Sequence, residues 1–379
     1  MPVAFRTRFT KALAWVFQIG LGALLGVGIG KWLVASPVPL PLVLLALVLF
    51  LTIAVHEAGH WLGSRYAGMR CYKISVLWLS LERRATGWHF RLGKNRLGAL
   101  GYVIALPLGF DKLNRQMAFF IAGGPAASLL VGLPALGLGW WGRSSGAASF
   151  VFEGFWLFGI GSLLTGVLNL LPFTTRFGNV SDGERLRRLY RGGPAAEQHE
   201  AQLRLSAASY QGVRPRQWDA ALLDKLLEAP AQSMQACLAH LFAYAHYLDA
   251  AALPTARQHL TCALKAGQAV SPLLRQHLYC EAAYLELVHG ENSEADSAQN
   301  VAQWLAAAEK IKPFTKRDNH FTKAVASCSA GQWAEARQWL QVCTQETAKL
   351  CDLGGLQQGL DRIQELHTLI EQRATAVVQ

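Results

Sequence analysis

The chain has 379 residues, a formal net charge of +11 at pH 7, 52% hydrophobic residues and 16% charged residues. This length exceeds the usual single domain, and the composition changes near Gly183 from Leu, Gly, Val, Phe and Trp to Ala, Gln, Leu, Glu and Arg. No nucleic-acid-binding motif accompanies the positive charge, and its Arg and Lys residues lie beside apolar segments, so we expect no nucleic-acid partner. We expect one half of the chain in lipid and the other in water.

The number and spacing of the cysteines indicate whether the compartment is oxidising or reducing. The chain has seven cysteines, an odd number, and none of them forms a CxxC pair. This pattern does not indicate a disulfide framework and predicts a reducing compartment. The cysteines that lie among alanines and leucines are expected to be small core residues; they are Cys262, Cys280 and Cys328.

Four apolar segments are long enough to cross a bilayer, and they lie in the first half of the chain. The first, at about residues 12–30, follows three basic residues and lacks a small-residue cleavage site, so we expect it to stay uncleaved. The others are expected at about residues 40–61, 117–141 and 150–171. Basic residues gather in residues 63–115 and again after the last span, which places these segments in the cytosol. We therefore predict cytosolic N- and C-termini, and the short loops favour a bacterial plasma (inner) membrane.

The segment between the second and third spans has β-strand character. Residues 71–80 and 86–92 carry β-branched and aromatic residues around a charged turn, which predicts a β-hairpin. Residues 98–103 predict a further strand. An exposed edge strand beside a protease site could pair with an unwound substrate segment. The alternative is a plain surface hairpin.

The second span contains the sequence Val55-His56-Glu57-Ala58-Gly59-His60. Positions i and i+4 of a helix share a face, so His56 and His60 can bind one zinc ion with Glu57 beside the open coordination position. Zinc would polarise a scissile carbonyl and acidify a water, and Glu57 would move the proton of that water to the leaving amine. The pattern could also arise by chance on a solvated helix, but the apolar residues before it favour function, because ionisable groups are costly at membrane depth.

A second group of polar residues follows the fourth span. The span ends in Asn169-Leu170-Leu171-Pro172, and Ser181-Asp182-Gly183-Glu184 follows after a loop. Ser181 and Glu184 form a capping-box pattern, so Asp182 could be only an acidic residue of the first helical turn. A catalytic zinc typically takes three protein ligands and keeps one position open, however, and Asp182 could supply the third. The two roles are compatible.

These motifs resemble, in order, those of the site-2 protease family of intramembrane zinc metalloproteases, which are M50-like peptidases. The resemblance covers about residues 40–190, including Gly123-Gly124-Pro125 in the third span. The chain departs from the family pattern in the longer insertion at residues 173–181 and in Ser128, where many members have asparagine. The resemblance implies that His56, His60 and Asp182 bind one zinc ion per chain. It also implies that Glu57 is the catalytic base. The residues that it implies for the substrate groove are Asn169, Pro172, Gly123, Gly124 and Pro125.

The family implies hydrolysis of a peptide bond within or next to a transmembrane helix of a partner protein, known as regulated intramembrane proteolysis. Two alternatives stay open. A catalytically inactive, membrane-anchored scaffold would be favoured if Asp182 could not reach the metal. A zinc transporter is less favoured, because we find no second set of intramembrane ligands along a path.

The second half of the chain predicts helix after helix, separated by glycine and proline. Similar segments at residues 256–260 and 336–340 resemble a degenerate tetratricopeptide-type array, and a plain helical bundle is the alternative. Such an array could bind a cytosolic peptide or protein partner. We therefore expect an all-α polytopic membrane protein with a small β-hairpin near the active site and an all-α helical-repeat soluble domain. The expected parts are a membrane-embedded metalloprotease domain at 1–183, a basic linker at 184–194 and a cytosolic helical domain at 195–379.

Overall fold

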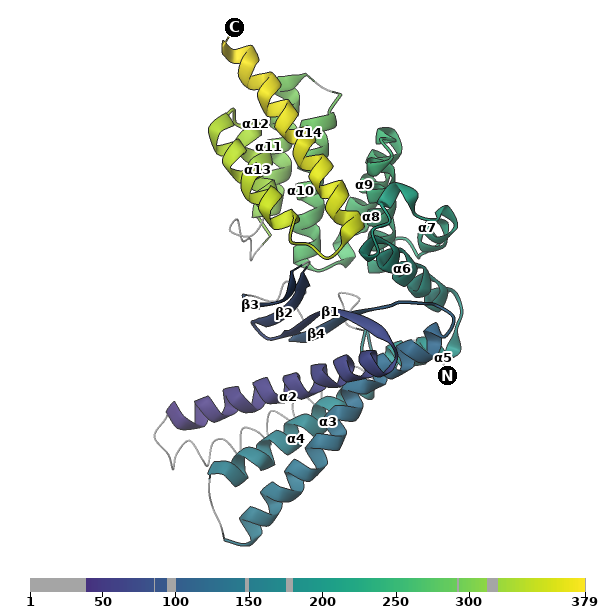
Figure 1. The fold of residues 1–379 in the computed structure, drawn as a ribbon, viewed down its shortest axis with the longest axis vertical. Coiled ribbons are helices and arrows are strands. Elements are labelled where there is room, and N and C mark those ends of the chain that lie inside the picture. The colour runs from purple at the N-terminus through teal and green to yellow at the C-terminus, as the bar shows by residue number, and fades with distance from the viewer. Residues whose placement is uncertain are drawn as a thin grey trace. The chain divides into compact units, whose positions relative to one another are not determined.

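The computed structural model describes residues 39–84, 86–93, 100–146, 150–174, 180–291, 293–311 and 320–378 (Figure 1). Three helices in these ranges are long and apolar enough to cross a membrane. They are α2 (Pro39–Tyr66), α3 (Leu113–Ser144) and α4 (Phe150–Leu170). They coincide with the spans predicted at 40–61, 117–141 and 150–171, whereas the span predicted at 12–30 lies outside the described residues.

The chain divides into two compact units. The first, called here the membrane unit, contains α2 up to Gly63, α3 from Phe119, all of α4 and the start of α5 (Asp182–Arg191). The second contains the β-sheet and the helices from α6 onward. The sheet therefore groups with the C-terminal helices although its sequence lies between two spans. The domain boundaries expected at residues 183 and 194 stay a prediction.

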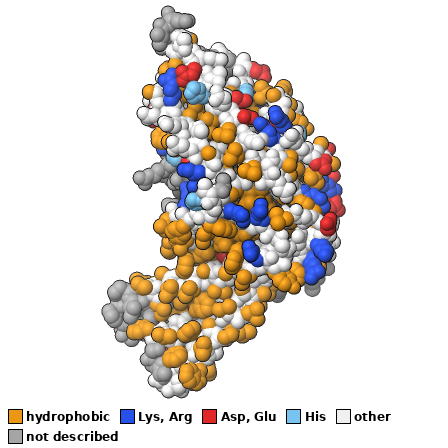
Figure 2. Space-filling model, viewed as in Figure 1, with side chains coloured by type: hydrophobic (Ala, Val, Ile, Leu, Met, Phe, Trp, Pro, Cys, Tyr) orange, Lys and Arg blue, Asp and Glu red, His pale blue; other side chains and the backbone are white. Residues whose placement is uncertain are grey.

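The helices of the membrane unit approach each other closely where glycines meet. A Cβ atom added to Gly59 of α2 would lie 2.2 Å from the carbonyl oxygen of Gly123, and one added to Gly123 would lie 2.3 Å from the carbonyl oxygen of Gly59. Such contact between helix backbones is typical of small residues at membrane helix interfaces. The outer surface of this unit is rich in apolar side chains, which cover the lower part of Figure 2. They include Leu130, Leu133 and Trp140 of α3, each more than half exposed.

The predicted hairpin is part of a larger sheet. Its four antiparallel strands lie in the order β3-β2-β1-β4, and they are β1 (Met69–Val76), β2 (Leu79–Arg84), β3 (Gly87–Leu92) and β4 (Gly101–Pro107). The single strand expected at 71–80 is broken into β1 and β2 by a turn at Leu77, whose φ of 51° lies in the left-handed region. The further strand expected near residue 98 is β4, which pairs with β1.

Edge strand β3 shows an unusual alternation of side chains. Trp88, Phe90 and Leu92 on one face are 45%, 62% and 66% exposed, whereas His89 and Arg91 on the other face are half-buried. An antiparallel sheet that faces water on one side normally shows the opposite arrangement, with apolar residues buried and polar residues exposed. The exposed face of this edge is therefore apolar.

The C-terminal helices pack mainly with their neighbours in sequence, as α8 with α9, α10 with α11 and α12 with α13. Serine caps begin three of them, because Ser233, Ser271 and Ser293 accept backbone N–H groups at the starts of α8, α10 and α11. This confirms a helical second half; its tetratricopeptide-like character stays a prediction. The helices are α6 (Pro194–Tyr210), α7 (Ala220–Leu227), α8 (Met234–Asp249), α9 (Leu253–Ala266), α10 (Pro272–His289), α11 (Glu294–Glu309), α12 (His320–Ser329), α13 (Trp333–Thr347) and α14 (Leu353–Val378), with short 3₁₀ turns at Pro215–Gln217 and Gly267–Ala269.

The last helix, α14, closes this part of the fold by packing on α6, α10, α12 and α13 (Figure 1). Its side chains Ile363, Leu366 and Ile370 are buried in the same apolar cluster as residues of α10, α12 and α13. An ion pair between Arg362 and Glu281 of α10, 2.8 Å apart, joins the same surfaces. Helix α14 is thus an integral part of the core.

Candidate metal centre

The two histidines of the predicted motif lie side by side on α2. His56 and His60 are one helical turn apart and only 6% and 7% exposed. Their Nε2 atoms are 3.2 Å apart, so both rings point toward one position. The spacing of four residues on a helix produces this arrangement.

Asp182 is the first residue of α5, and the chain before it is held close to the end of α4. The Ser181 hydroxyl donates to the carbonyl of Leu171 at 2.7 Å and accepts the N–H of Glu184 at 3.2 Å. A Cβ atom added to Gly183 would lie 1.9 Å from the carbonyl oxygen of Leu170, so only glycine permits this approach. Ser181 therefore caps α5, and the side chain of Asp182 is left to face the histidines.

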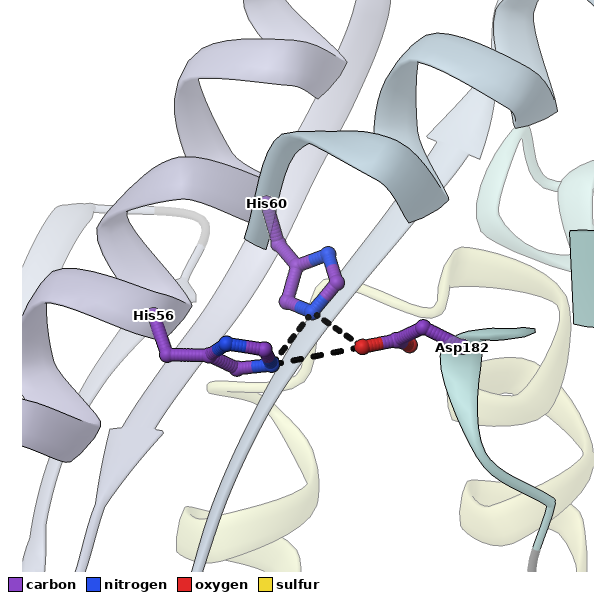
Figure 3. A group of neighbouring side chains, drawn as sticks. All are labelled: His56, His60 and Asp182. Atoms are coloured by element: carbon purple, nitrogen blue, oxygen red, sulfur yellow. Dashed lines mark hydrogen bonds and ion pairs between the residues drawn. The ribbon is translucent and has the colours of Figure 1, made fainter. Parts of the chain in front are cut away.

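Figure 3 shows His56, His60 and Asp182 converging from two helices. The Asp182 carboxylate oxygen Oδ2 is 3.3 Å from Nε2 of His56 and 3.4 Å from Nε2 of His60. A tetrahedral zinc ion with bonds of about 2.0–2.1 Å separates its ligand atoms by about 3.3–3.4 Å. The three atoms thus have the chemistry and the separations of a zinc ligand set. In the described part of the chain they form the one cluster of His, Cys, Asp and Glu that could hold a metal ion.

The histidines also affect the charge of Asp182. Burial by itself would raise the pKa of this carboxyl group, but hydrogen bonds and charge interactions with His56 and His60 lower it, and the net pKa lies well below its usual value. Asp182 is therefore ionised at neutral pH, as a metal ligand must be.

The other ring nitrogen of each histidine contacts α3. His60 Nδ1–H donates to the backbone carbonyl of Phe120 at 2.8 Å, and His56 Nδ1 lies 3.1 Å from the hydroxyl of Ser128. Metal-binding histidines usually donate their second N–H in this way, which fixes the ring orientation. Sequence reasoning noted Ser128 only as a departure from a family pattern and missed the Phe120 carbonyl. A polar residue inside an apolar span is the signal that could have found Ser128.

Glu57 lies between the two histidines in sequence and is 5% exposed. Its Oε2 atom is buried and has no hydrogen-bond partner among the described residues. A buried carboxylate oxygen without a partner is costly in a structural role. It is the state expected of a group that exchanges protons with a bound molecule.

The residues predicted to line a substrate groove have packing contacts of their own. Gly123 meets Gly59, and a Cβ atom on Gly124 would lie 2.3 Å from Nε2 of His60. The side-chain amide of Asn169 donates to the carbonyl of Thr165, and Pro172 is exposed. Pro125 is fully buried. The substrate-binding assignment stays a prediction. Gly123 and Gly124 are needed in any case for the close packing of α3 against α2 and His60.

Membrane-spanning helices with a buried His-His-Asp cluster and an adjacent glutamate define a membrane metallopeptidase. The family model described as peptidase family M50, a family of zinc-dependent peptidases, matches residues 44–147, so this part of the chain is similar to that family. The match includes His56, Glu57 and His60 but ends before Asp182, which is connected to them by geometry alone. No curated protein and no solved structure matches the chain.

Proposed function

We propose that this protein is an intramembrane zinc endopeptidase of the site-2 protease type, which cleaves a peptide bond within or next to a transmembrane helix of a partner protein. The observation that carries the proposal is the convergence of His56, His60 and Asp182 within a unit of membrane-spanning helices. The scaffold alternative would be favoured if Asp182 were out of reach of the metal, but its carboxylate lies 3.3 Å from Nε2 of His56, which supports the peptidase.

The proposed reaction uses each residue in one role. His56, His60 and Asp182 would hold one zinc ion, which when bound supplies Lewis-acid polarisation of a peptide carbonyl and of water. Glu57 would accept a proton from the attacking water at Oε2 and donate it to the nitrogen of the leaving amine. The burial of all four side chains keeps bulk water away from this exchange.

The substrate must present an extended backbone, because a helix hides its carbonyl groups in hydrogen bonds. The sheet has two edge strands, β3 and β4, either of which could pair with such a segment. The distribution of basic residues supports cytosolic termini. The short loops favour a bacterial inner membrane. A cytosolic peptide or protein partner at the helical domain stays part of the proposal.

The test is the zinc content and the proteolytic output of variants purified in detergent or expressed in membranes. We expect about one zinc ion per chain in wild type and in Glu57→Gln, and strong loss of zinc in His56→Ala and Asp182→Ala. His367→Ala, which removes an exposed histidine of α14, is the control and should retain zinc.

Proteolysis is then measured as membrane-protein fragments that form with wild type and disappear with Glu57→Gln. Loss of a general base typically lowers the rate about 10²–10⁴-fold. Fragments that persist at the wild-type rate would remove Glu57 from its role, and a wild type that binds no zinc under metal-replete conditions would favour the scaffold.

A further inference from the structure

We propose that Ser128 is a positioning residue that holds the His56 imidazole in its metal-binding orientation. The inference rests on the proposed zinc site and adds a residue outside the ligand set and the catalytic base. Ser128 is on α3, 72 residues from His56 in sequence, and its side chain is completely buried. Its hydroxyl lies 3.1 Å from His56 Nδ1.

The two histidines are held by groups of different chemistry. The Phe120 carbonyl beside His60 can only accept a hydrogen bond, so it requires a proton on Nδ1 and leaves the lone pair of Nε2 for a metal. The Ser128 hydroxyl can donate or accept. When it accepts from His56 Nδ1–H, Nε2 of His56 also presents its lone pair toward Asp182 and His60. Ser128 thus orients the ring of His56 and can stabilise its metal-binding tautomer by accepting, and of the two histidines only His56 has a replaceable side chain as the partner of Nδ1.

The position of this hydroxyl is fixed by contacts on both sides of α3. The hydroxyl of Ser162 on α4 donates to the backbone carbonyl of Ser128 at 2.9 Å, and both residues are buried. The contact between Gly59 and Gly123 sets the separation of α2 and α3 just before Ser128. Three helices therefore determine the distance between Ser128 and His56, which is the preorganisation that a positioning residue needs.

Removal of a hydrogen-bond partner behind a metal-bound histidine typically lowers metal affinity about 10–100-fold. We therefore expect Ser128→Ala to weaken zinc binding by about this factor and Ser128→Thr, which retains the hydroxyl, to restore most of it. Affinity is measured by competition with a chelator on the full-length protein in detergent. Ser144→Ala is the matched control, because Ser144 is an exposed hydroxyl at the far end of the same helix.

A second measurement separates ligand orientation from general stability. In the cobalt-loaded protein, we expect the visible absorption bands of Ser128→Ala to shift relative to wild type, and those of Ser144→Ala to coincide with wild type. If Ser128→Ala folds poorly, Ser128→Cys provides a similar volume with a weak hydrogen-bonding group and should show the same loss of affinity.

Wild-type affinity and an unshifted cobalt spectrum in Ser128→Ala would overturn the inference. Equal weakening in Ser128→Ala and Ser128→Thr would also overturn it, because packing and not the hydroxyl would then be responsible. These outcomes are distinct from a failure of the peptidase function. If the wild type binds zinc but cleaves nothing, and Ser128→Ala lowers the zinc affinity, the peptidase proposal would be refuted and the positioning role supported.

Discussion

The imidazole of His60 occupies the space that a side chain at position 124 would need. An added Cβ atom would lie 2.3, 2.6 and 2.7 Å from three atoms of the ring, so His60 or α3 would have to move. Gly124 therefore leaves room for the imidazole of His60, which is a proposed zinc ligand.

We predict that Gly124→Ala lowers zinc affinity, because the displaced His60 ring can no longer share a centre with His56 and Asp182. Loss of ligand orientation typically costs about 10–100-fold in affinity. The measurement is chelator competition on purified protein. Gly137→Ala is the control, since a Cβ atom at this position of the same helix meets nothing within 4 Å. Equal affinities in the two variants would show that the ring adapts to the added methyl group.

The candidate site was partly predictable from the sequence. His56, Glu57 and His60 are close in sequence, so helix periodicity alone places them together. Asp182 is more than 120 positions away, and only the need of a catalytic zinc for a third ligand and the family resemblance connected it to the histidines. Ser128 and the Phe120 carbonyl were not predicted as contacts, because helix packing decides which turn of α3 faces α2, and composition does not determine this register.

At the scale of elements, α8 and α9 are joined by a pair of histidines. Nδ1 of His240 lies 3.0 Å from Nδ1 of His259, and the ring of Tyr247 stacks on His259. Burial lowers the pKa of both histidines, and the proximity of His240 lowers the pKa of His259 further. At neutral pH both imidazoles are therefore uncharged in the folded protein, and one ring nitrogen donates a hydrogen bond to the other.

This pair predicts a pH dependence of stability. Because the folded pKa values lie below the unfolded value of about 6.5, the unfolded chain binds more protons and stability falls as pH decreases below that value. We expect the melting temperature to drop between pH 7.5 and pH 5.5, and to drop less in His259→Gln. The control is His367→Gln, which alters an exposed histidine. A pH dependence unchanged in His259→Gln would exclude the pair as its source.

The sequence predicted whole elements better than their internal turns. The spans were identified because membrane thickness demands long apolar runs, and their positions agree with α2, α3 and α4. The turn between β1 and β2 was missed because Leu77 adopts a positive φ, where glycine or asparagine is the usual signal. A continuous strand was the natural prediction from its β-branched and aromatic neighbours.

At the scale of the whole molecule, α14 completes the apolar core of the helical domain. Truncation after Asp352 would remove three buried aliphatic side chains from the core, namely Ile363, Leu366 and Ile370. Each such loss costs about 2–5 kcal/mol, and the sum approaches the whole stability of a typical domain, about 5–15 kcal/mol. A partner that binds this face of α10 and α12 would also have to displace α14.

We therefore predict that the truncated chain loses cooperative unfolding of its helical domain and becomes sensitive to protease. The measurement is limited proteolysis together with thermal unfolding in detergent. Removal of residues 374–379 is the control, because that segment contains none of these core residues. Protease resistance equal to wild type after truncation at Asp352 would show that α14 is a detachable segment.

The grouping of the sheet with the C-terminal helices was beyond sequence reasoning. Tyr72 of β1 and Leu106 of β4 are buried with Ala207 of α6, and the rings of Tyr72 and Tyr210 lie 4.3 Å apart. These contacts join segments more than 100 residues apart, and no periodicity in either segment specifies the other. Removal of everything beyond Pro194 would therefore also expose the buried side of the sheet.

The contact between Gly59 and Gly123 restricts how this sequence can diverge. A larger residue at either position meets the backbone of the other helix, so a change at one position cannot be compensated by a smaller side chain at its partner, which is already glycine. Stepwise substitution therefore has no viable first step at this pair. Descendants of this chain that keep the metal site should retain both glycines while the lipid-facing residues around them drift.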